Sequence, residues 1–414
     1  MKKILLITYH FPPSAASGAF RLLGFARHLP TCGWQPIVVA PPTLPWEPVD
    51  EQLTEQISAE VIAVPVPYPS ASPRLLRKFA QNLIWLPRAW SACARAVAEH
   101  QPDAILTSGP PHCVHALGYF LQQDTGLPWV ADFRDPWISD GTGRRRGLLD
   151  VWALSWERSV FERADLILAN APNACRLFQK TYPSHAGKVV TLTNGFDPRP
   201  SPLPRPFIDS CIRLLHAGEI YAGRDPSPLF SAIARLNLRD DARPLRVDII
   251  GRCESQLPPH DFVVWQGQRG YGETLDAMAQ ADILVLFDSP GRKIGVPAKL
   301  YEYLGAGRPI LALAENDGDV ATILRQSGIA HRIAPPRDEA AIAGALMNLE
   351  DEVYCGARFQ RAGSVRGQNG TLQTCPTEQF TRASLARVLA SHFDRLTGTA
   401  PAQVAPTTLE EAAR

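Results

Sequence analysis

Residues 3–29 read KILLITYHFPPSAASGAFRLLGFARHL, and this stretch decides the fold. It opens on an apolar run, Lys3–Thr8, which predicts a buried strand, and a loop of small residues and prolines follows. The loop leads into Gly18–Leu29, whose apolar spacing predicts a helix. The apolar run is shorter than the roughly 7–15 residues of a secretory signal peptide. A strand that passes through a loop into a helix is typical of a βαβ unit and a parallel sheet.

The same alternation continues along the chain on both sides of a proline-rich stretch, PRPSPLPRPFIDS. Proline restricts its own backbone and that of the preceding residue, so this stretch is predicted to be a linker. The predicted strands are Lys3–Thr8, Gln35–Ala40, Val61–Val66, Ala104–Thr107, Trp129–Asp132, Leu166–Ala169, Val189–Leu192, Ile212–Ala217, Leu245–Ile250, Phe262–Gln266, Ile283–Phe287, Pro309–Ala314 and Ala330–Ile333. The predicted helices are Gly18–Leu29, Trp85–Glu99, His112–Gln123, Leu148–Ala164, Asn173–Thr181, Pro228–Leu236, Gly272–Ala279, Pro297–Gly305, Val320–Ser327, Glu339–Leu349 and Arg382–Leu396.

The alternation predicts an α/β protein with two doubly wound domains. The expected parts are an N-terminal domain at 1–197, a linker at 198–211, a second domain at 212–380, a helix at 381–396 that returns to the first domain, and a disordered tail at 397–414. Ligands in such sheets lie beyond the carboxyl ends of the strands, which places the expected site in a cleft between the domains.

Composition excludes several classes of protein. The 414 residues are 45% hydrophobic and 20% charged, with a net charge of +1, so a nucleic-acid-binding surface is not indicated. Eight cysteines occur without a C-x-x-C pair, which argues against a metal centre or a disulfide framework. No apolar stretch approaches the roughly 20 residues of a membrane-spanning helix. We therefore expect a cytoplasmic protein.

Candidate functional residues in the first half follow three predicted strands. Gly18 and Arg21 open the first helix, where backbone N–H groups favour an anion; a turn without a ligand is the alternative, and Arg21 would hold either a phosphate or a neighbouring carboxylate. His115 lies near the start of another helix, where it is either structural or close to a ligand. The remaining candidates, at the end of WVADFRDPW, either pin the loop or serve as acid–base and acceptor-binding groups: Asp132, Arg134 and Asp135.

Two segments of the second half carry the remaining candidates. In HAGEIYAGRDP, Gly218 permits close backbone approach and Arg224 suits a phosphate, although a surface turn would look the same. In GVPAKLYEYLGAGRPILAL, Pro297 suits the first turn of a helix. Lys299 and Glu302 share one face of that helix, either as a solvated ion pair or as ligands for phosphate and ribose.

These segments resemble the glycosyltransferase family 4 group of GT-B enzymes. The motifs FPP…SG…R, SGPP..VH, ADFRDPW, TLTNGFDP, HAGEIY.GRDP and G.P.KLYEYL.AG.PIL occur in the family's order and cover roughly residues 1–395. The resemblance implies two Rossmann-like domains facing across a cleft. It also implies a retaining transfer from a nucleoside-diphosphate sugar, without a metal or other cofactor, to a saccharide or lipid-linked acceptor in cell-surface polysaccharide or lipopolysaccharide synthesis.

The resemblance also assigns roles to particular residues. It implies that Glu302 contacts the ribose, that Arg224 and Lys299 lie near the diphosphate, and that Gly18 faces the donor phosphates. Two positions depart from the family pattern. The first glutamate of its E-x7-E signature is Ile294 here, so a neighbour such as Asp288 would have to replace its contact. The histidine that many members carry after the DFRD strand is absent.

Two other functions remain open at this point. A nucleotide-sugar 2-epimerase would share the fold and act without an acceptor, and a scaffold protein would keep the fold without catalysis. Contact with the inner membrane is a separate hypothesis. It rests on PRLLRKFAQNLIWLPRAW, residues 73–90, and on Arg144–Arg146, which mix basic with apolar side chains as helices at anionic bilayers do. The alternative is a sheet-covering helix with solvated arginines.

Overall fold

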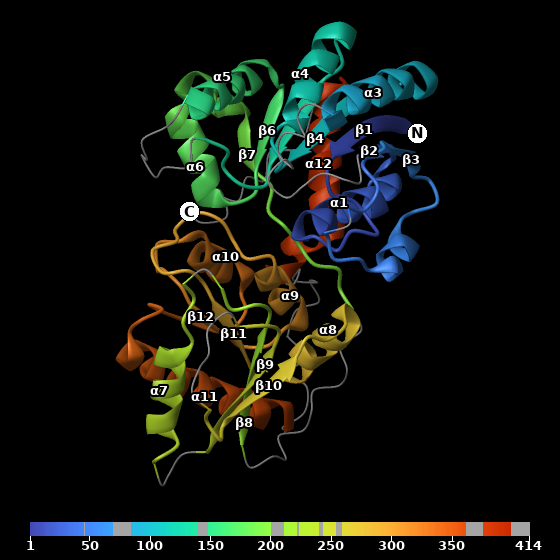
Figure 1. The fold of residues 1–414 in the computed structure, drawn as a ribbon. Coiled ribbons are helices and arrows are strands. Elements are labelled where there is room, and N and C mark those ends of the chain that lie inside the picture. The colour runs from blue at the N-terminus through green and yellow to red at the C-terminus, as the bar shows by residue number, and fades with distance from the viewer. Residues whose placement is uncertain are drawn as a thin grey trace, which may run out of the picture. The chain divides into compact units, whose positions relative to one another are not determined.

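The computed structural model describes residues 1–44, 46–68, 84–138, 148–199, 211–221, 223–239, 243–253, 259–361 and 376–398. The chain divides into two compact units, the first formed by 1–195 with 382–414 and the second by 196–381 (Figure 1). Most of the predicted linker, most of the predicted tail and most of the proposed membrane segment, with Arg144–Arg146, lie outside the described residues.

The first unit is built on a seven-stranded parallel sheet in the order β3-β2-β1-β4-β5-β6-β7. Its strands are β1 (Lys2–Thr8), β2 (Trp34–Ala40), β3 (Ile62–Pro65), β4 (Ala104–Gly109), β5 (Trp129–Phe133), β6 (Leu166–Ala169) and β7 (Val189–Thr191). Its helices are α1 (Ser17–His28), α3 (Leu86–His100), α4 (Val114–Thr125), α5 (Leu148–Arg163), α6 (Pro172–Thr181) and α12 (Arg382–Leu396). Strands buried on both faces explain the continuous apolar runs of the sequence.

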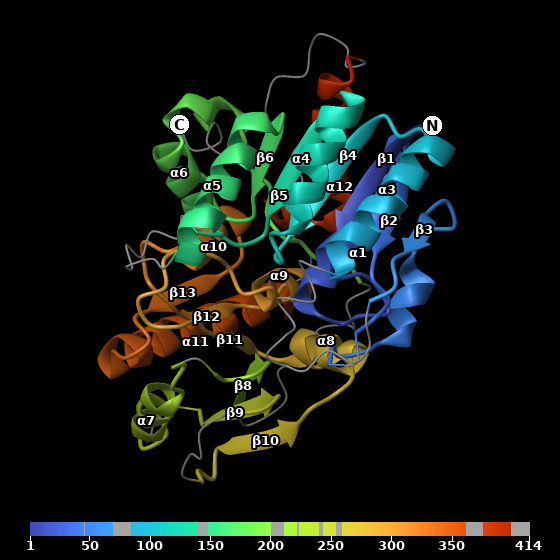
Figure 2. The same cartoon turned by 45° about the horizontal axis from the view of Figure 1, so that its top comes forward.

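Helices cover both faces of this sheet (Figure 2). On one face, α1 and the C-terminal helix α12 pack together, and Leu389 and Phe393 enter the same core cluster as Ile4 and Leu22. On the other face, α3 and α4 contact the central strands. The helix at the end of the chain therefore completes the core of the unit in which the chain begins.

The second unit repeats this architecture with six parallel strands in the order β10-β9-β8-β11-β12-β13. Its strands are β8 (Ile212–Ala217), β9 (Leu245–Ile250), β10 (Val263–Gly267), β11 (Ile283–Phe287), β12 (Ile310–Leu313) and β13 (His331–Ala334). Its helices are α7 (Ser227–Leu236), α8 (Tyr271–Gln280), α9 (Lys299–Ala306), α10 (Asp319–Ser327) and α11 (Glu339–Arg361). Each unit is thus a doubly wound α/β domain.

Several predicted helix boundaries were wrong: α4, for example, spans Val114–Thr125 rather than His112–Gln123, and two others have a local explanation. The helix α9 begins at Lys299 rather than at Pro297, because the N–H groups of Leu300 and Tyr301 donate to carbonyls three residues back, at 3.0 and 3.2 Å, so the chain before Lys299 forms a tighter turn than an α-helix. The helix α11 runs to Arg361 rather than Leu349, because no proline follows Leu349 within that span and the glycine there, Gly356, lies inside the helix.

Candidate functional site

In each unit the strand order reverses at one point, and ligands of doubly wound sheets bind at this point, beyond the carboxyl ends of the strands. In the first unit the reversal lies between β1 and β4, which end at Thr8 and Gly109. In the second unit it lies between β8 and β11, which end at Ala217 and Phe287. The candidate residues of both halves gather around these two points.

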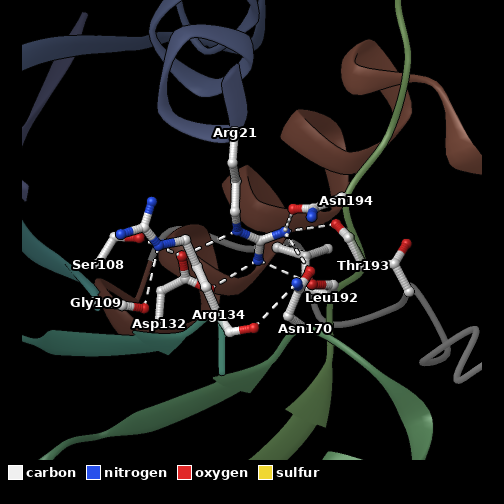
Figure 3. A network of polar contacts seen from close by, with 9 residues as sticks. All are labelled: Arg21, Ser108, Gly109, Asp132, Arg134, Asn170, Leu192, Thr193 and Asn194. Carbon is white, nitrogen blue, oxygen red and sulfur yellow. Dashed lines mark hydrogen bonds and ion pairs between the residues drawn. The ribbon is translucent and has the colours of Figure 1, made fainter. Parts of the chain in front are cut away.

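Arg21 and Asp132 form a buried ion pair in the first unit (Figure 3). Nε and Nη2 of Arg21 donate to the two carboxylate oxygens at 3.0 and 2.8 Å, and Ser108 donates its hydroxyl to the same carboxylate at 2.7 Å. The remaining guanidinium N–H groups reach the carbonyls of Leu192 and Thr193 at 2.8 and 2.6 Å. Arg21 and Asp132 are therefore satisfied by each other and by their surroundings, and they tie α1 to β4, β5 and the chain after β7.

Arg134 follows β5 and lies beside this pair in Figure 3. Its Nε donates to the carbonyl of Gly109 at 3.1 Å, and its Nη2 donates to the carbonyl of Pro110. Its Nη1 is buried and has no hydrogen-bond partner among the described residues. Burial lowers the pKa of Arg134 to about 10, against the opposing charges of Asp132 and of Asp135, which is exposed. The guanidinium remains charged at neutral pH with one donor group unused.

Gly18 lies directly against that unused group. A Cβ atom at Gly18 would overlap Nη1 of Arg134, so the first turn of α1 approaches the guanidinium this closely only because the residue is glycine. The N-cap residue, Ala16, makes no side-chain cap. An uncapped helix N-terminus beside a buried cation with a free donor forms a favourable position for an anion.

His115 is completely buried. The hydroxyl of Thr107 accepts a hydrogen bond from Nε1 of Trp129 at 2.9 Å and is also hydrogen-bonded to Nδ1 of His115, 2.8 Å away. Burial, with the nearby charge of Arg134, lowers the pKa of His115 to about 3. The ring is stacked on Phe133 with 4.5 Å between centroids. His115 is a neutral packing residue in this structure, with no exposed nitrogen to offer a substrate.

The structure also brings together two residues that the sequence analysis did not single out, His10 and Glu47. Nδ1 of His10 lies 2.8 Å from Oε1 of Glu47; the histidine side chain is 23% exposed, whereas the glutamate side chain is 6% exposed. Burial acts to raise the pKa of Glu47, but the neighbouring polar groups of His10 and Ser14 hold it below its ordinary value. The sequence signal for this pair is that His10 is the second residue after the strand β1. No sequence pattern marks Glu47.

In the second unit, Lys299 lies against Gly218, and Arg224, whose guanidinium lies 4.5 Å over the ring of Tyr221, is near enough for its charge to act on Lys299. A Cβ atom at Gly218, where φ is 142°, would overlap Nζ of Lys299. Nζ has no hydrogen-bond or ion-pair partner among the described residues, and Nε of Arg224 is likewise buried without one. Burial and the charge of Arg224 lower the pKa of Lys299 to about 8, although Glu302 and Glu219 oppose the shift. Two cations with spare donors therefore lie close together beyond β8.

Two buried residues that the sequence analysis missed, Tyr303 and His216, support this position. The hydroxyl of Tyr303 accepts the backbone N–H of Ala217 at 2.9 Å and donates to the carbonyl of Val285 at 3.1 Å. His216 Nδ1 also donates to that carbonyl, at 2.9 Å. Burial, with the charge of Lys299, lowers the pKa of His216 to about 3. These bonds fix α9 against the ends of β8 and β11.

The loop before α9 holds the remaining candidates. Pro297 is buried just before the helix, and Glu302 is half-buried in its first turn, three residues after Lys299. Asp288 is buried, and its Oδ1 accepts from the backbone of Ser289 at 2.9 Å and from Arg292 at 3.2 Å. Burial raises the pKa of Asp288 despite the charge of Arg292. Asp288 thus anchors the loop that contains Ile294.

No cluster of three or more His, Cys, Asp or Glu side chains that could hold a metal ion occurs among the described residues. In the same part of the chain, no helix is both long and apolar enough to cross a bilayer.

Comparison with known proteins agrees with this architecture. Residues 18–195 match the family model described as a glycosyl transferase 4-like domain. Sucrose-phosphate synthase from Thermosynechococcus elongatus is 17% identical, with a TM-score of 0.65 over 97% of this chain and 100% of that one. WaaG, described as a glycosyltransferase involved in lipopolysaccharide biosynthesis, is 17% identical, with a TM-score of 0.54 over 96% and 100%. These similarities confirm the predicted GT-B fold of two Rossmann-like domains.

Two further similarities complete the comparison. HepE from Anabaena, solved in complex with UDP-glucose, is 14% identical with a TM-score of 0.56 over 96% of this chain and 98% of that one. The mouse protein named mitochondrial assembly of ribosomal large subunit protein 1 is 31% identical over 111 residues. That match spans 26% of this chain and 44% of the mouse protein.

Proposed function

We propose that this protein is a glycosyltransferase that transfers a sugar from a nucleoside-diphosphate sugar bound in the second unit. The observation that carries the proposal is a pair of cations, Lys299 against Gly218 and Arg224 nearby, whose Nζ and Nε have no hydrogen-bond partner among the described residues. Like charges held together in a partly buried position are unfavourable unless a ligand of opposite charge joins them. A diphosphate supplies that charge, and the reversal of strand order is the place where a doubly wound sheet binds one.

The other residues of the second unit fit the same donor. Glu302 lies on the face of α9 that carries Lys299, so its carboxylate is suited to ribose hydroxyls while the ammonium binds phosphate. Gly218 leaves room for the diphosphate near the backbone, and Pro297 positions the start of α9. The UDP-glucose complex of HepE supports a nucleotide sugar as the kind of donor.

In the first unit the proposal gives different roles to the candidate residues. Gly18 and Arg134 form a second anion position, whereas Arg21 and Asp132 maintain the architecture around it. His115 is assigned to packing, and Asp135, which is exposed after β5, is assigned to the acceptor side of this loop.

The finer features of the proposal rest on the family resemblance. They are a retaining, hexosyltransferase-type reaction without a metal or other cofactor, a saccharide or lipid-linked acceptor, a role in cell-surface polysaccharide or lipopolysaccharide synthesis, and a cytoplasmic location with peripheral contact at the inner membrane. WaaG is described as acting in lipopolysaccharide biosynthesis, which supports the class of acceptor. The anomeric configuration of the product, determined by NMR, would test retention.

The first experiment measures thermal unfolding with UDP, GDP, ADP, CMP and TDP on the wild type, Lys299→Ala and Lys293→Ala. Lys293 is an exposed lysine in the same loop, paired with Asp317 at 2.6 Å, and it serves as the matched control. A ligand at a hundredfold excess over its Kd stabilises the folded protein by about 2.7 kcal/mol. We expect one nucleotide to stabilise the wild type and Lys293→Ala, and to have little effect on Lys299→Ala.

The next step incubates the protein with the corresponding nucleotide sugars and measures released nucleoside diphosphate. Release supports transfer. Isomerisation of the sugar without release would instead identify a 2-epimerase, and binding without turnover would identify a scaffold protein. No stabilisation of a folded wild type by any nucleotide would contradict the donor site itself.

A further inference from the structure

The loop between β11 and α9 carries a charged side chain, Arg292, that the roles assigned above do not use. The loop follows one of the two strands at the reversal of strand order and leads into the helix that carries Lys299 and Glu302. The positive charge of Arg224 acts on Lys299 and also on Asp288, the first residue of the loop. The loop therefore starts beside the proposed diphosphate position, at the edge where a doubly wound sheet receives its ligand.

The guanidinium of Arg292 is oriented by the loop itself. Its Nη1 donates to Oδ1 of Asp288 at 3.2 Å, and its Nε donates to the carbonyl of Ile294 at 3.2 Å. Because Asp288 directly follows β11, this ion pair keeps the guanidinium near the carboxyl end of that strand. Nη2 makes no hydrogen bond within the described part of the chain, and the arginine side chain is 29% exposed. The guanidinium is thus held in one orientation with Nη2 left for a ligand.

Two glycines fix the turn on which Arg292 lies. A Cβ atom at Gly295, where φ is 92°, would lie 2.7 Å from Nη2 of Arg292, which is too close for a side chain. The N–H of Gly295 donates to Oδ2 of Asp319 at 2.7 Å. The N–H of Gly291 donates to Oε1 of Glu315 at 2.8 Å. Both sides of the turn are therefore attached to the segment after β12, and the guanidinium is preorganised for binding.

Acidic side chains surround this loop, but they are engaged by it. Asp288 is buried and accepts from Arg292, and the carboxylates that fix the turn accept from backbone N–H groups. Asp317 is paired with Lys293 at 2.6 Å. Ile294, which stands where the family pattern has a glutamate, offers no acceptor for a sugar hydroxyl. The group that this loop can present to a donor sugar is therefore a cation, the guanidinium of Arg292.

We propose that Arg292 binds a carboxylate on the donor sugar, so that the protein selects the nucleotide of a hexuronic acid over that of a neutral hexose. Nη2 donates to a carboxylate oxygen, and the charge of the guanidinium attracts the whole group. A sugar hydroxyl can accept the same hydrogen bond, but it gains less because it carries no charge. This inference rests on the proposed function, since it concerns the sugar of the same donor.

The test measures Kd by isothermal titration for nucleotide sugars in pairs that differ only at carbon 6. Glucose, galactose and mannose are each compared with the corresponding uronic acid, on UDP, GDP, ADP and TDP. The proteins are the wild type, Arg292→Gln, Arg292→Lys and Lys293→Gln. Lys293 is the adjacent exposed cation, paired with Asp317 at 2.6 Å, and serves as the matched control. Thermal unfolding reports on the folding of each variant, and the nucleoside diphosphate alone reports on the donor site.

We expect the wild type to bind one uronic acid about tenfold more tightly than the matching hexose, because the hydrogen bond to a carboxylate is charge-assisted. Arg292→Gln should bind the two sugars of that pair with about equal affinity. Arg292→Lys keeps the charge but loses the planar fork, so about a threefold preference should remain. Lys293→Gln should match the wild type, and the nucleoside diphosphate alone should bind all of these proteins equally.

The outcomes separate this inference from the proposed function. A wild type that binds neither a nucleoside diphosphate nor a nucleotide sugar would defeat the donor site itself. A wild type that binds nucleotides but holds the hexose at least as tightly as the uronic acid in every pair would overturn the inference and leave the donor site in place. A preference that survives in Arg292→Gln would mean that another group reads the carboxylate and that Arg292 only holds the loop. If Arg292→Gln does not fold, Arg292→Lys decides: an undiminished preference there overturns the assignment.

Discussion

Both units place charged side chains at the carboxyl edge of a parallel sheet, but they use the charges differently. In the first unit, Arg21 and Asp132 have opposite charges and are hydrogen-bonded to each other. The remaining N–H groups of Arg21 donate to backbone carbonyls. In the second unit, Lys299 and Arg224 have the same charge, and each keeps donor groups without a partner among the described residues. The first arrangement is complete without a ligand, whereas the second is completed by an anion.

This difference separates structural from ligand-binding charges. A buried ion pair whose hydrogen bonds are all made contributes to the architecture, and removing one member leaves the other uncompensated. Neighbouring cations that repel each other weaken the folded state until a ligand neutralises them. Variants in the first unit should therefore affect mainly stability, and variants in the second should affect mainly binding.

The largest expected effect is that of Asp132→Ala. The change leaves the guanidinium of Arg21 buried without its carboxylate, so we expect the free energy of unfolding to fall by about 3–5 kcal/mol. Urea unfolding followed by circular dichroism measures the loss.

The double variant Arg21→Met/Asp132→Leu serves as the control for this interpretation. Replacing both charges by apolar groups of similar volume should recover much of the stability lost in Asp132→Ala. If Asp132→Ala is instead as stable as the wild type but inactive, Asp132 belongs to the reaction and the comparison between the units is wrong.

A smaller effect is expected from Gly18→Ala. The added methyl group would overlap Nη1 of Arg134. Nε and Nη2 of Arg134 are hydrogen-bonded to the carbonyls of Gly109 and Pro110, so the guanidinium can move away only by breaking these bonds. We expect a loss of about 2 kcal/mol in the free energy of unfolding. Gly344→Ala is the matched control, because a Cβ there meets nothing within 4 Å in the helix α11. The free energy of unfolding of Gly344→Ala should rise by about 0.5–1 kcal/mol. An equal loss of stability in Gly18→Ala and Gly344→Ala would contradict the contact between Gly18 and Arg134.

The fold was largely predictable from the sequence because the strands are short apolar runs and the helices between them have apolar residues at helical spacing. The predicted helix boundaries were wrong where the backbone hydrogen bonds that set them leave no pattern in the sequence. The start of α9 depends on how its first turn is hydrogen-bonded, which no apolar spacing reveals. The pairing of Arg21 with Asp132 joins residues 111 apart in the chain.

The candidate sites were predictable only in part, because sequence identifies residue types at strand ends but not their partners. Gly18, Lys299 and Arg224 were singled out because glycines and cations follow strands there. Arg21 and Asp132 were singled out for the same reason, although the structure pairs them with each other. Glu47 was missed because it reaches His10 from a loop that has no periodicity.

The pH dependence of nucleotide binding provides the finest test of the second unit. Because the pKa of Lys299 is lowered from 10.5 to about 8, the folded protein without ligand releases this proton over a range in which the unfolded chain still holds it. The stability of the wild type relative to Lys299→Met should therefore rise as pH increases from about 8 to 10.5.

A bound diphosphate favours the ammonium form of Lys299, so binding above pH 8 must take up a proton. Affinity should fall about tenfold for each pH unit above the pKa of the free protein. Isothermal titration at pH 7 and pH 9 measures the change. Lys299→Met should bind weakly and equally at both values, since it has no proton to take up. An equal fall in that variant would assign the titration to another group and would remove Lys299 from the diphosphate site.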